Sequence, residues 1–316
     1  MSRKQTVYSE RGSYLGIPGV SQRVRGGKLR TPPPPVPVHA FAAERALALD
    51  ADTPSGPIAL DLGNELAIPW RATTPSFFAT YLCMQPGDAV ASDFVASAEM
   101  YLAIQGEGSS TWGDETLEWQ AGDVFFLPGG SGAIHRAKAQ RAILYAVSDE
   151  PLVRFLGLEA PSGGCKNIPA VHYHADHVMQ LQRDTFEAAN ASGVIHFGID
   201  GDLAYSSFIP AWKWMRPGEQ QEPHCHAAVA LQIIVRAADC HSIVNDQRID
   251  WQDYLVMITP AGHLHSHHAN GSEPGMYLIT QDVPLYKHLR GHWYKEPGTG
   301  IVQQDWSGGG AVAPSA

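Results

Sequence analysis

The sequence predicts an all-β protein, and three observations carry this prediction. From about residue 76 onward, apolar runs of about four to eight residues alternate with clusters of Gly, Pro, Asn and Asp, as in short strands joined by turns. The 31 Gly and 23 Pro are generous for a helical chain of 316 residues, and both residue types are frequent in tight turns. In addition, one order of strands occurs twice, which favours two β-domains with only a few short helices.

The repeated pattern occupies the centre of the chain. Each copy contains, in order, a strand ending in a Pro-Gly turn, a second strand, an Asp-led strand that ends near a proline, and a last strand. The first copy runs from Phe78 to Val147 and the second from Trp212 to Thr280, so the copies lie about 130 residues apart. This period is too long for a solenoid and is typical of a duplicated β-domain.

These signals divide the chain into five parts. We expect an N-terminal arm and lead-in (1–70), a first β-domain (71–155), a linker (156–205), a second β-domain (206–295) and a C-terminal tail (296–316). The prolines of the arm favour an extended chain, a short helix is expected around 40–49, and the linker includes an amphipathic stretch near 177–189.

Composition narrows the class of protein. The net charge is −10 at pH 7 and no basic stripe is present, so a nucleic-acid partner is not expected. The four cysteines are scattered without a C-x-x-C pair, which argues against a zinc ribbon or a disulfide framework. No apolar run is long enough to span a bilayer, and the N-terminus lacks an apolar signal region, so we expect a soluble cytoplasmic protein.

Histidines gather at two places in the second copy. His224 and His226 alternate just after a Pro-Gly turn, and alternate residues of a strand share a face. A second cluster, in which His263, His265 and His267 also share a face, follows the next proline. Two imidazoles from one strand and one from a neighbour suit a divalent iron, copper, nickel or zinc ion. Solvated turn residues are the alternative interpretation of both clusters.

The motif order resembles that of the cupins. Gly218-x5-His224-x-His226 followed by Pro260-x-Gly262-x2-His265 resembles the two cupin signature motifs, and the duplication makes the chain similar to a bicupin. This resemblance implies two double-stranded β-helix (jelly-roll) barrels, with His224, His226 and His265 as the metal ligands of the second.

A narrower resemblance follows from a missing residue. Cupins usually carry a glutamate ligand shortly after H-x-H, but nothing from Ala227 to Val235 is acidic. The chain is similar in this respect to the gentisate 1,2-dioxygenase-like bicupins, which also place a second histidine two residues after the third ligand, as His267 is placed here. The resemblance implies three His ligands for Fe(II) and cleavage of a hydroxylated aromatic carboxylate or related ring by dioxygen. It also implies a homo-oligomer, a dimer or tetramer.

The resemblance also suggests roles for three further side chains. We expect His267 and His263 to bind a substrate hydroxyl or to transfer protons, and Gln232 to orient the substrate or a water. Gln232 stands where the family has an arginine, which removes a positive charge near the metal. Trp212 and Trp214 share a strand face, and core packing is favoured for them over a substrate pocket.

The first copy is not expected to hold a metal. Counted from its Pro-Gly turn, the ligand positions fall on Asp93, Val95 and Ala133, whereas Glu99 and His135 lack ligand partners. This copy is therefore interpreted as structural, for example as a dimer surface or a lid.

Three alternatives stay open. The linker cluster of His172, His174 and His177, with Asp176 nearby, has a spacing that suits a metal, although hydrogen bonding is favoured for it. The second alternative is a non-oxidative metallo-cupin, an isomerase or decarboxylase that uses Mn or Zn. The third is a binding cupin without catalysis, which an intact set of three histidines disfavours.

Overall fold

The computed structural model describes residues 32–160, 163–166, 168–199 and 205–304. The chain divides into two compact units, residues 1–34 and 35–316, and every helix and strand discussed below belongs to the second unit. Residues 1–31 of the predicted arm and 305–316 of the predicted tail lie outside the described residues. No helix in the described part of the chain is long and apolar enough to cross a membrane.

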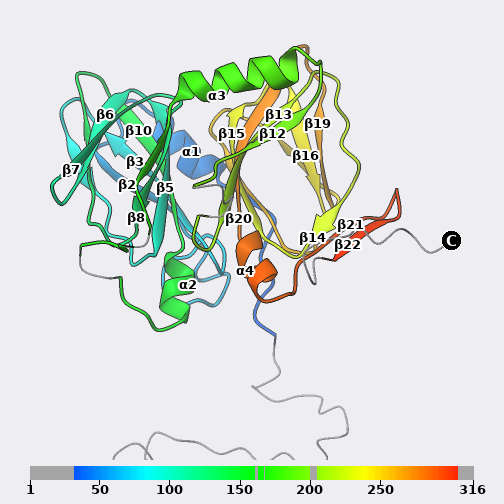
Figure 1. Cartoon of the computed structure of the whole chain (residues 1–316), viewed down its shortest axis with the longest axis horizontal. Coiled ribbons are helices and arrows are strands. Elements are labelled where there is room, and N and C mark those ends of the chain that lie inside the picture. The colour runs from blue at the N-terminus through cyan, green and yellow to red at the C-terminus, as the bar shows by residue number, and fades with distance from the viewer. Residues whose placement is uncertain (1–31, 161–162, 167, 200–204, 305–316) are drawn as a thin grey trace, which may run out of the picture. The chain divides into compact units, whose positions relative to one another are not determined.

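The first copy of the repeat folds into two facing sheets (Figure 1). Strands β3, β10, β5 and β8 are neighbours in one sheet, and β4, β9, β6 and β7 in the other. The strands of this copy are β3 (Phe78–Met84), β4 (Ala89–Ala91), β5 (Ala98–Gln105), β6 (Glu107–Trp112), β7 (Glu115–Gln120), β8 (Val124–Pro128), β9 (Ile134–Ala137) and β10 (Ala142–Ser148).

The second copy repeats this order. Strands β13, β20, β15 and β18 form one sheet, while β19, β16 and β17 form the other and residue 224, just before β14, bridges to β19. The strands of this copy are β13 (Ile209–Met215), β14 (Cys225–His226), β15 (Ala230–Arg236), β16 (Cys240–Val244), β17 (Gln247–Asp250), β18 (Val256–Thr259), β19 (His265–Ala269) and β20 (Gly275–Gln281). Each copy thus pairs strands 1-8-3-6 and 2-7-4-5, which is the jelly-roll order, so the predicted all-β bicupin fold is confirmed.

The repeated Pro-Gly turns have a backbone cause. Gly87 and Gly218 follow the first strand of their copies and adopt φ angles of +79° and +77°. This left-handed region is open to glycine at little cost, so the same dipeptide turns the chain from the first strand towards the second in both copies.

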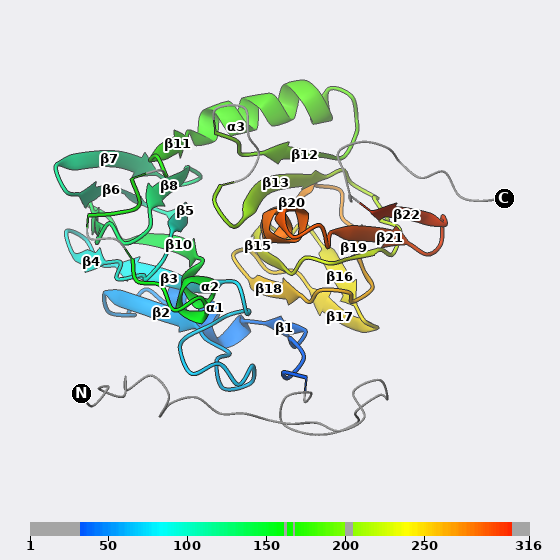
Figure 2. The ribbon, with the colours of Figure 1, turned by 60° about the horizontal axis from the view of Figure 1, so that its bottom comes forward.

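Segments outside the repeat extend the sheets. Strand β1 (His39–Ala40) pairs with β18, β2 (Gly56–Leu60) with β3, β11 (Val171–Tyr173) with β8, and β12 (Gly193–His196) with β13 (Figure 2). Strand β21 (Trp293–Glu296) pairs with β14 beside the histidines, and β22 (Ile301–Gln304), which lies in the predicted tail, pairs with β21.

Four α-helices complete the described part of the chain. Helix α1 (Ala42–Leu49) lies where a short helix was predicted, and α3 (Ala175–Gln182) continues into η3 (Arg183–Glu187) in the predicted amphipathic stretch. Helices α2 (Glu150–Phe155) and α4 (Val283–His288) follow the last strand of each copy.

One hydrophobic core joins the two copies. Alternate residues of β13 face opposite sides, so Trp212 and Trp214 enter a core shared with Tyr81 and Tyr145 of the first copy, while Met215 enters the separate core inside the second barrel. This placement agrees with core packing for the two tryptophans. A fully buried aromatic side chain contributes about 2–3 kcal/mol by burial alone, so this shared core holds the copies together.

Reciprocal hydrogen bonds also link the two copies. Asp149 follows the last strand of the first copy and accepts a hydrogen bond from the Ser207 hydroxyl (2.9 Å), just before the second copy begins. Asp282, at the same place in the second copy, accepts from the Ser76 hydroxyl (2.7 Å) and from the Val229 amide (2.9 Å). Each copy therefore ends on an aspartate that binds the start of the other.

Removing one of these aspartates should destabilise the fold. Asp282→Ala leaves the buried Ser76 hydroxyl and the Val229 amide without their acceptor, so we expect the unfolding free energy to fall by about 2–4 kcal/mol in urea denaturation. Asp250→Ala is the matched control, because its exposed ion pair with Arg248 should contribute less than about 1 kcal/mol. Equal losses in the two variants would contradict a structural role for Asp282.

Candidate functional site

A backbone bridge brings the three predicted ligand histidines together. The amide of His224 donates to the carbonyl of His265 (2.9 Å), and the amide of His265 donates back to the carbonyl of His224 (2.8 Å). The Gly262 amide donates to the carbonyl of His226 (2.8 Å), which ties the turn before β19 to β14. This antiparallel pairing places one histidine of the second cluster directly opposite the H-x-H pair.

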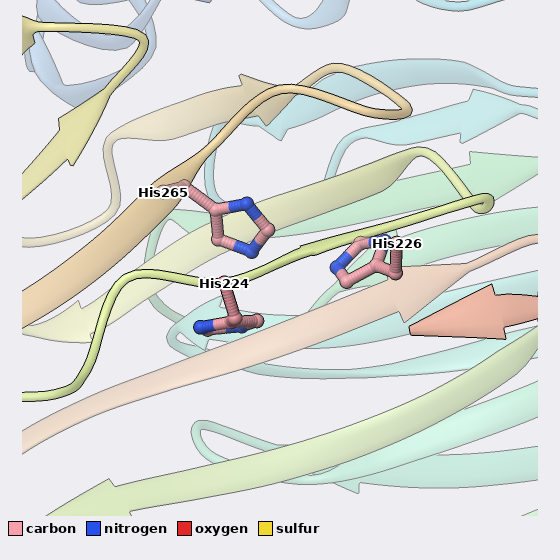
Figure 3. A group of neighbouring side chains, drawn as sticks. All are labelled: His224, His226 and His265. Carbon is pink, nitrogen blue, oxygen red and sulfur yellow. The ribbon is translucent and has the colours of Figure 1, made fainter. Parts of the chain in front are cut away.

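The three imidazoles gather around a common space (Figure 3). The ring centroid of His265 lies 4.2 Å from that of His224 and 4.9 Å from that of His226. One nitrogen from each ring lies within 4.8 Å of the other two, and the residues are only 7%, 6% and 3% exposed for His224, His226 and His265. The predicted trio is thus a compact and buried cluster.

All three rings are oriented by backbone carbonyls. The Nδ1 atom of His224 lies 3.1 Å from the carbonyl of Glu222, that of His226 lies 2.7 Å from the carbonyl of Ala228, and that of His265 lies 2.9 Å from the carbonyl of His263. A carbonyl only accepts, so each Nδ1 carries a proton and each neutral ring has its lone pair on Nε2. This is the tautomer of a histidine ligand whose other ring nitrogen is fixed by a hydrogen bond.

Burial keeps these rings neutral. Desolvation lowers the pKa of His226 to about 4 and that of His265 to about 3, with the neighbouring histidines adding to the effect. Burial also lowers the pKa of His224. Metal binding requires unprotonated imidazole, so at neutral pH no proton has to leave before the nitrogens can coordinate.

The donor set fits a borderline divalent metal. Three imidazole nitrogens suit iron, copper, nickel or zinc better than calcium or magnesium. Glu99 of the first copy keeps the usual cupin glutamate position and pairs with Ser148, the last residue of β10. Ala230 pairs with Gln281, the last residue of β20, so in the second copy an alanine holds this position. The amide of Gln281 lies 3.3 Å from Nε2 of His226, on the side of the ring where a ligand would bind.

The structure places His267 and Gln232 together beside the trio. The side-chain amide of Gln232 donates to Nε2 of His267 (3.3 Å), and Nδ1 of His267 lies 2.8 Å from the Ser242 hydroxyl. That hydroxyl accepts from the Trp251 indole (2.7 Å) and lies 3.7 Å from the Met257 sulfur. Every bond is satisfied when His267 donates from Nδ1 to Ser242, so Nε2 remains the acceptor that faces the site.

His263 occupies the turn before β19. Its carbonyl orients the His265 ring, and its own Nδ1 is buried without a hydrogen-bond partner in the described part of the chain. Its charge lies near enough to His265 to contribute to lowering the pKa of that ring. His263 therefore lies next to the trio in the turn, and its expected role towards substrate stays a prediction.

Sequence reasoning missed two charged residues of the same barrel. Lys213 is on the β13 face opposite the two tryptophans and is paired with Tyr277, whose ring lies 5.2 Å from His267. Burial lowers the pKa of Lys213 and raises that of Glu219, while each charge partly offsets the shift of the other. The signal that could have identified Lys213 is its position between two core tryptophans, because the residue between them on a strand faces the opposite side.

The barrel also contains unpartnered acceptors. The buried oxygens Oε2 of Glu219, Oε1 of Gln221 and Oε1 of Gln232 have no hydrogen-bond partner among the described residues. The backbone amide of Gln221 donates to the backbone carbonyl of His267 (3.0 Å), so the segment around Gln221 runs along β19, the strand that carries His265 and His267. Unsatisfied buried acceptors are costly, and of these three side chains Gln232 contacts His267, so its oxygen is available to a polar ligand at the site.

The first copy lacks the ligands but keeps their surroundings. Its counterpart of the histidine bridge is the hydrogen bond from the amide of Ser92 to the carbonyl of Ala133 (2.8 Å), so the position equivalent to His224 is Ser92 and not Asp93. The shift arises because the first copy has one residue fewer between its Pro-Gly turn and this bridge. Neither Ser92 nor Ala133 offers an imidazole.

A tryptophan–serine–histidine network recurs there. The Trp119 indole donates to the Ser110 hydroxyl (2.9 Å), which lies 2.7 Å from Nδ1 of His135, as in the network of His267. Tyr101 stands in the place of Gln232, with its ring 4.6 Å from that of His135. The recurrence shows that this network belongs to the duplicated barrel, whereas the trio belongs to the second copy alone.

Comparison with known proteins supports the resemblance predicted from the motifs. The chain is 28% identical over 134 residues to 5-aminosalicylate 1,2-dioxygenase from Comamonas sp., which covers 40% of this chain and 35% of that protein. It is 24% identical over 97 residues to gentisate 1,2-dioxygenase from Ralstonia sp., which covers 31% of this chain and 27% of that protein. The matches thus span about a third of the length of these relatives.

The fold extends further than the sequence matches. Salicylate 1,2-dioxygenase from Pseudoaminobacter salicylatoxidans superposes with a TM-score of 0.70 at 13% sequence identity, covering 87% of this chain and 93% of that one. No family model matches the chain. The predicted similarity to gentisate 1,2-dioxygenase-like bicupins is therefore confirmed.

The buried carboxyl of the first copy provides a test by pH. Burial raises the pKa of Glu99 from 4.5 to about 7, so between these values the folded chain binds more protons than the unfolded chain and stability falls as pH rises. Glu99→Gln should remove this part of the slope, up to about 3 kcal/mol, in denaturation curves at pH 4.5 to 7.5. The exposed Glu115→Gln is the control, and an unchanged slope in Glu99→Gln would refute the assignment.

Proposed function

We propose that this chain is an Fe(II)-dependent dioxygenase that cleaves the ring of a hydroxylated aromatic carboxylate or a related compound. The observation that carries the proposal is the trio of His224, His226 and His265, whose Nδ1 protons are all held by backbone carbonyls, so that each ring has Nε2 as its lone-pair nitrogen. The relatives named as 5-aminosalicylate and gentisate 1,2-dioxygenases support the reaction class.

The trio is well suited to hold the ion with open coordination positions. Three protein ligands on an ion that prefers six leave positions for two oxygens of a substrate and for dioxygen. When bound there, Fe(II) supplies the Lewis-acid and redox chemistry that dioxygen activation requires. The fixed tautomers and the backbone bridge pre-organise the three nitrogens, so little reorganisation is needed when the ion binds.

His267 is the proposed hydrogen-bond acceptor for a substrate hydroxyl. It is neutral at physiological pH because burial lowers its pKa well below the usual value, and its Nε2 already accepts a hydrogen bond from Gln232. A substrate hydroxyl that replaces this amide donor donates its hydrogen bond to Nε2, and Gln232 then turns its unpartnered oxygen or its amide towards the ligand. His263 performs a similar hydrogen-bonding role at the rim.

Lys213 is the proposed partner of the substrate carboxylate. Gln232 occupies the family's arginine position, so the positive charge must come from another strand. Lys213 faces the same barrel interior, and its charge acts on both His224 and His267. The nearby Glu219 favours the charged form of the lysine in spite of burial.

Oxygen uptake by the iron-loaded chain tests the reaction. We expect dioxygen consumption and loss of aromatic absorbance in equal amounts with at least one of gentisate, salicylate, 5-aminosalicylate or 1-hydroxy-2-naphthoate. His224→Ala and His265→Ala should lose bound iron and at least about 100-fold of the activity, because each removes a ligand.

His268→Ala is the matched control for these variants. His268 is on the same strand as His265 but faces away, stacked on His241 and bonded to Gln220, so iron content and activity should persist. If iron-loaded wild type consumes no oxygen with any of these four substrates, the dioxygenase proposal is wrong. Turnover without dioxygen in Mn- or Zn-loaded protein would instead establish the non-oxidative alternative.

Substituting Lys213 separates binding from chemistry. Lys213→Met keeps the length of the side chain and removes its charge, so KM for aromatic carboxylates should rise about tenfold or more while kcat changes little. KM for 2-aminophenol, which has no carboxylate, should stay the same, and Lys213→Arg should recover most of the loss. A uniform rise in KM for both kinds of substrate would show that Lys213 does not recognise the carboxylate.

A further inference from the structure

A second cluster of metal-binding side chains lies where the linker joins the first barrel. Strand β11 pairs with β8, with Tyr173 opposite Val124, and this register brings His172 and His174 beside Asp123. One ligand atom from each of these three residues lies within 4.8 Å of the other two. Together with the trio of the second barrel, this is one of two such groups in the described part of the chain.

The arrangement repeats the design of the trio. His172 and His174 alternate along an extended segment, so their rings share a face, with centroids 3.9 Å apart. The third residue, Asp123, directly precedes the antiparallel neighbour β8, while His265 begins β19 in the second barrel. An H-x-H pair and one residue of the adjacent strand therefore converge in both places.

The distances match a small coordination sphere. Nε2 of His172 lies 2.9 Å from Oδ2 of Asp123. Ligands that bind one ion at about 2.0–2.2 Å lie roughly 3–3.5 Å from each other, so the histidine and the carboxylate are already close to their ligand spacing. The other carboxylate oxygen, Oδ1, accepts from the Ala175 amide (2.8 Å) at the start of α3, which leaves Oδ2 facing the imidazoles.

The surroundings of Asp123 are compatible with a bound cation. Its side chain is 2% exposed, and among the described residues the side chain that contacts it is His172, which is charged only when protonated. A buried carboxylate is costly unless it is paired or coordinates a metal. A backbone amide, that of Gln120 (3.1 Å), also donates to Oδ2 but brings no full charge.

We propose that Asp123, His172 and His174 form a second metal site that is independent of the trio. Two imidazole nitrogens and a carboxylate oxygen suit a borderline divalent ion such as Zn²⁺, and the exposed His174 leaves a position open to water. The ion links β8 of the first barrel to β11 and to the first turn of α3. It therefore braces the linker that connects the two copies.

This site differs from the one that the sequence suggested for the linker histidines. Asp176 is exposed and takes no part in the group, and the ring of His177 lies 5.9 Å from that of His174, outside the cluster. The carboxylate comes from Asp123, about 50 residues earlier in the chain, and is brought near only by the pairing of β11 with β8.

Metal stoichiometry tests the proposal on the full chain. After chelator treatment, Zn²⁺ is titrated into wild type and variants by calorimetry, with Co²⁺ absorption as a second probe of nitrogen and oxygen coordination. Wild type should bind two equivalents, and His174→Ala, an exposed substitution that should not disturb folding, should bind one. His177→Ala, also exposed, is the matched control and should bind two.

Hydrogen exchange gives a second measurement. Zn²⁺ should slow exchange of the α3 amides in wild type and His177→Ala but not in His174→Ala. Equal stoichiometry and equal exchange in wild type and His174→Ala would overturn the proposal. If wild type binds a single equivalent that is lost in His174→Ala and kept in His224→Ala, the linker site stands while the proposed catalytic centre fails.

Discussion

The reciprocal backbone pairing of His224 with His265 is the interaction on which the site depends. The two hydrogen bonds, of 2.9 and 2.8 Å, fix which residue of the second histidine cluster faces the H-x-H pair. A slip of one residue would turn every side chain of β19 to the opposite face and would present Ser266 or Leu264 instead. The hairpin of β21 and β22 pairs with β14 from the other side, so the strand that carries the first two histidines is held at both edges.

Comparison of the two copies separates the features that both barrels share from the trio, which belongs to the second barrel. Both barrels keep the tryptophan–serine–histidine network and the aspartate that binds the other copy, so these features serve the fold, and in the second barrel the network also orients the His267 ring beside the trio. The copies differ in their polar interior: the first retains the buried Glu99 where the second has Ala230. Without imidazole ligands around it, Glu99 is instead satisfied by Tyr101 and by a backbone amide, and burial favours its neutral form.

The features that could be predicted from the sequence are those that depend on the alternation of residues along a strand and on the spacing of turns. Alternation placed His224 and His226 on one face, and the repeated Pro-Gly turns revealed the duplication, because both signals arise within one strand and one turn. Contacts that depend on long-range strand pairing could not be predicted from the sequence. Asp123 lies beside His172 only because β8 pairs with β11. The residue equivalent to His224 in the first copy is shifted by one position because the loop before it is one residue shorter. The strand beside the histidines, β21, was missed because its partner, β14, is about 70 residues away in sequence.

Charge gives the final constraint on what the second barrel binds. A divalent ion held as proposed by three neutral imidazoles would keep its charge uncompensated, because the alanine at the glutamate position adds no anion. In a buried site such charge interacts strongly, because the surrounding dielectric is lower than that of water. With the proposed ion in place, an anionic ligand with two adjacent oxygen donors would therefore gain more than a neutral one. Lys213 would increase that preference and Glu219 would limit it, because their opposite charges act in the same barrel.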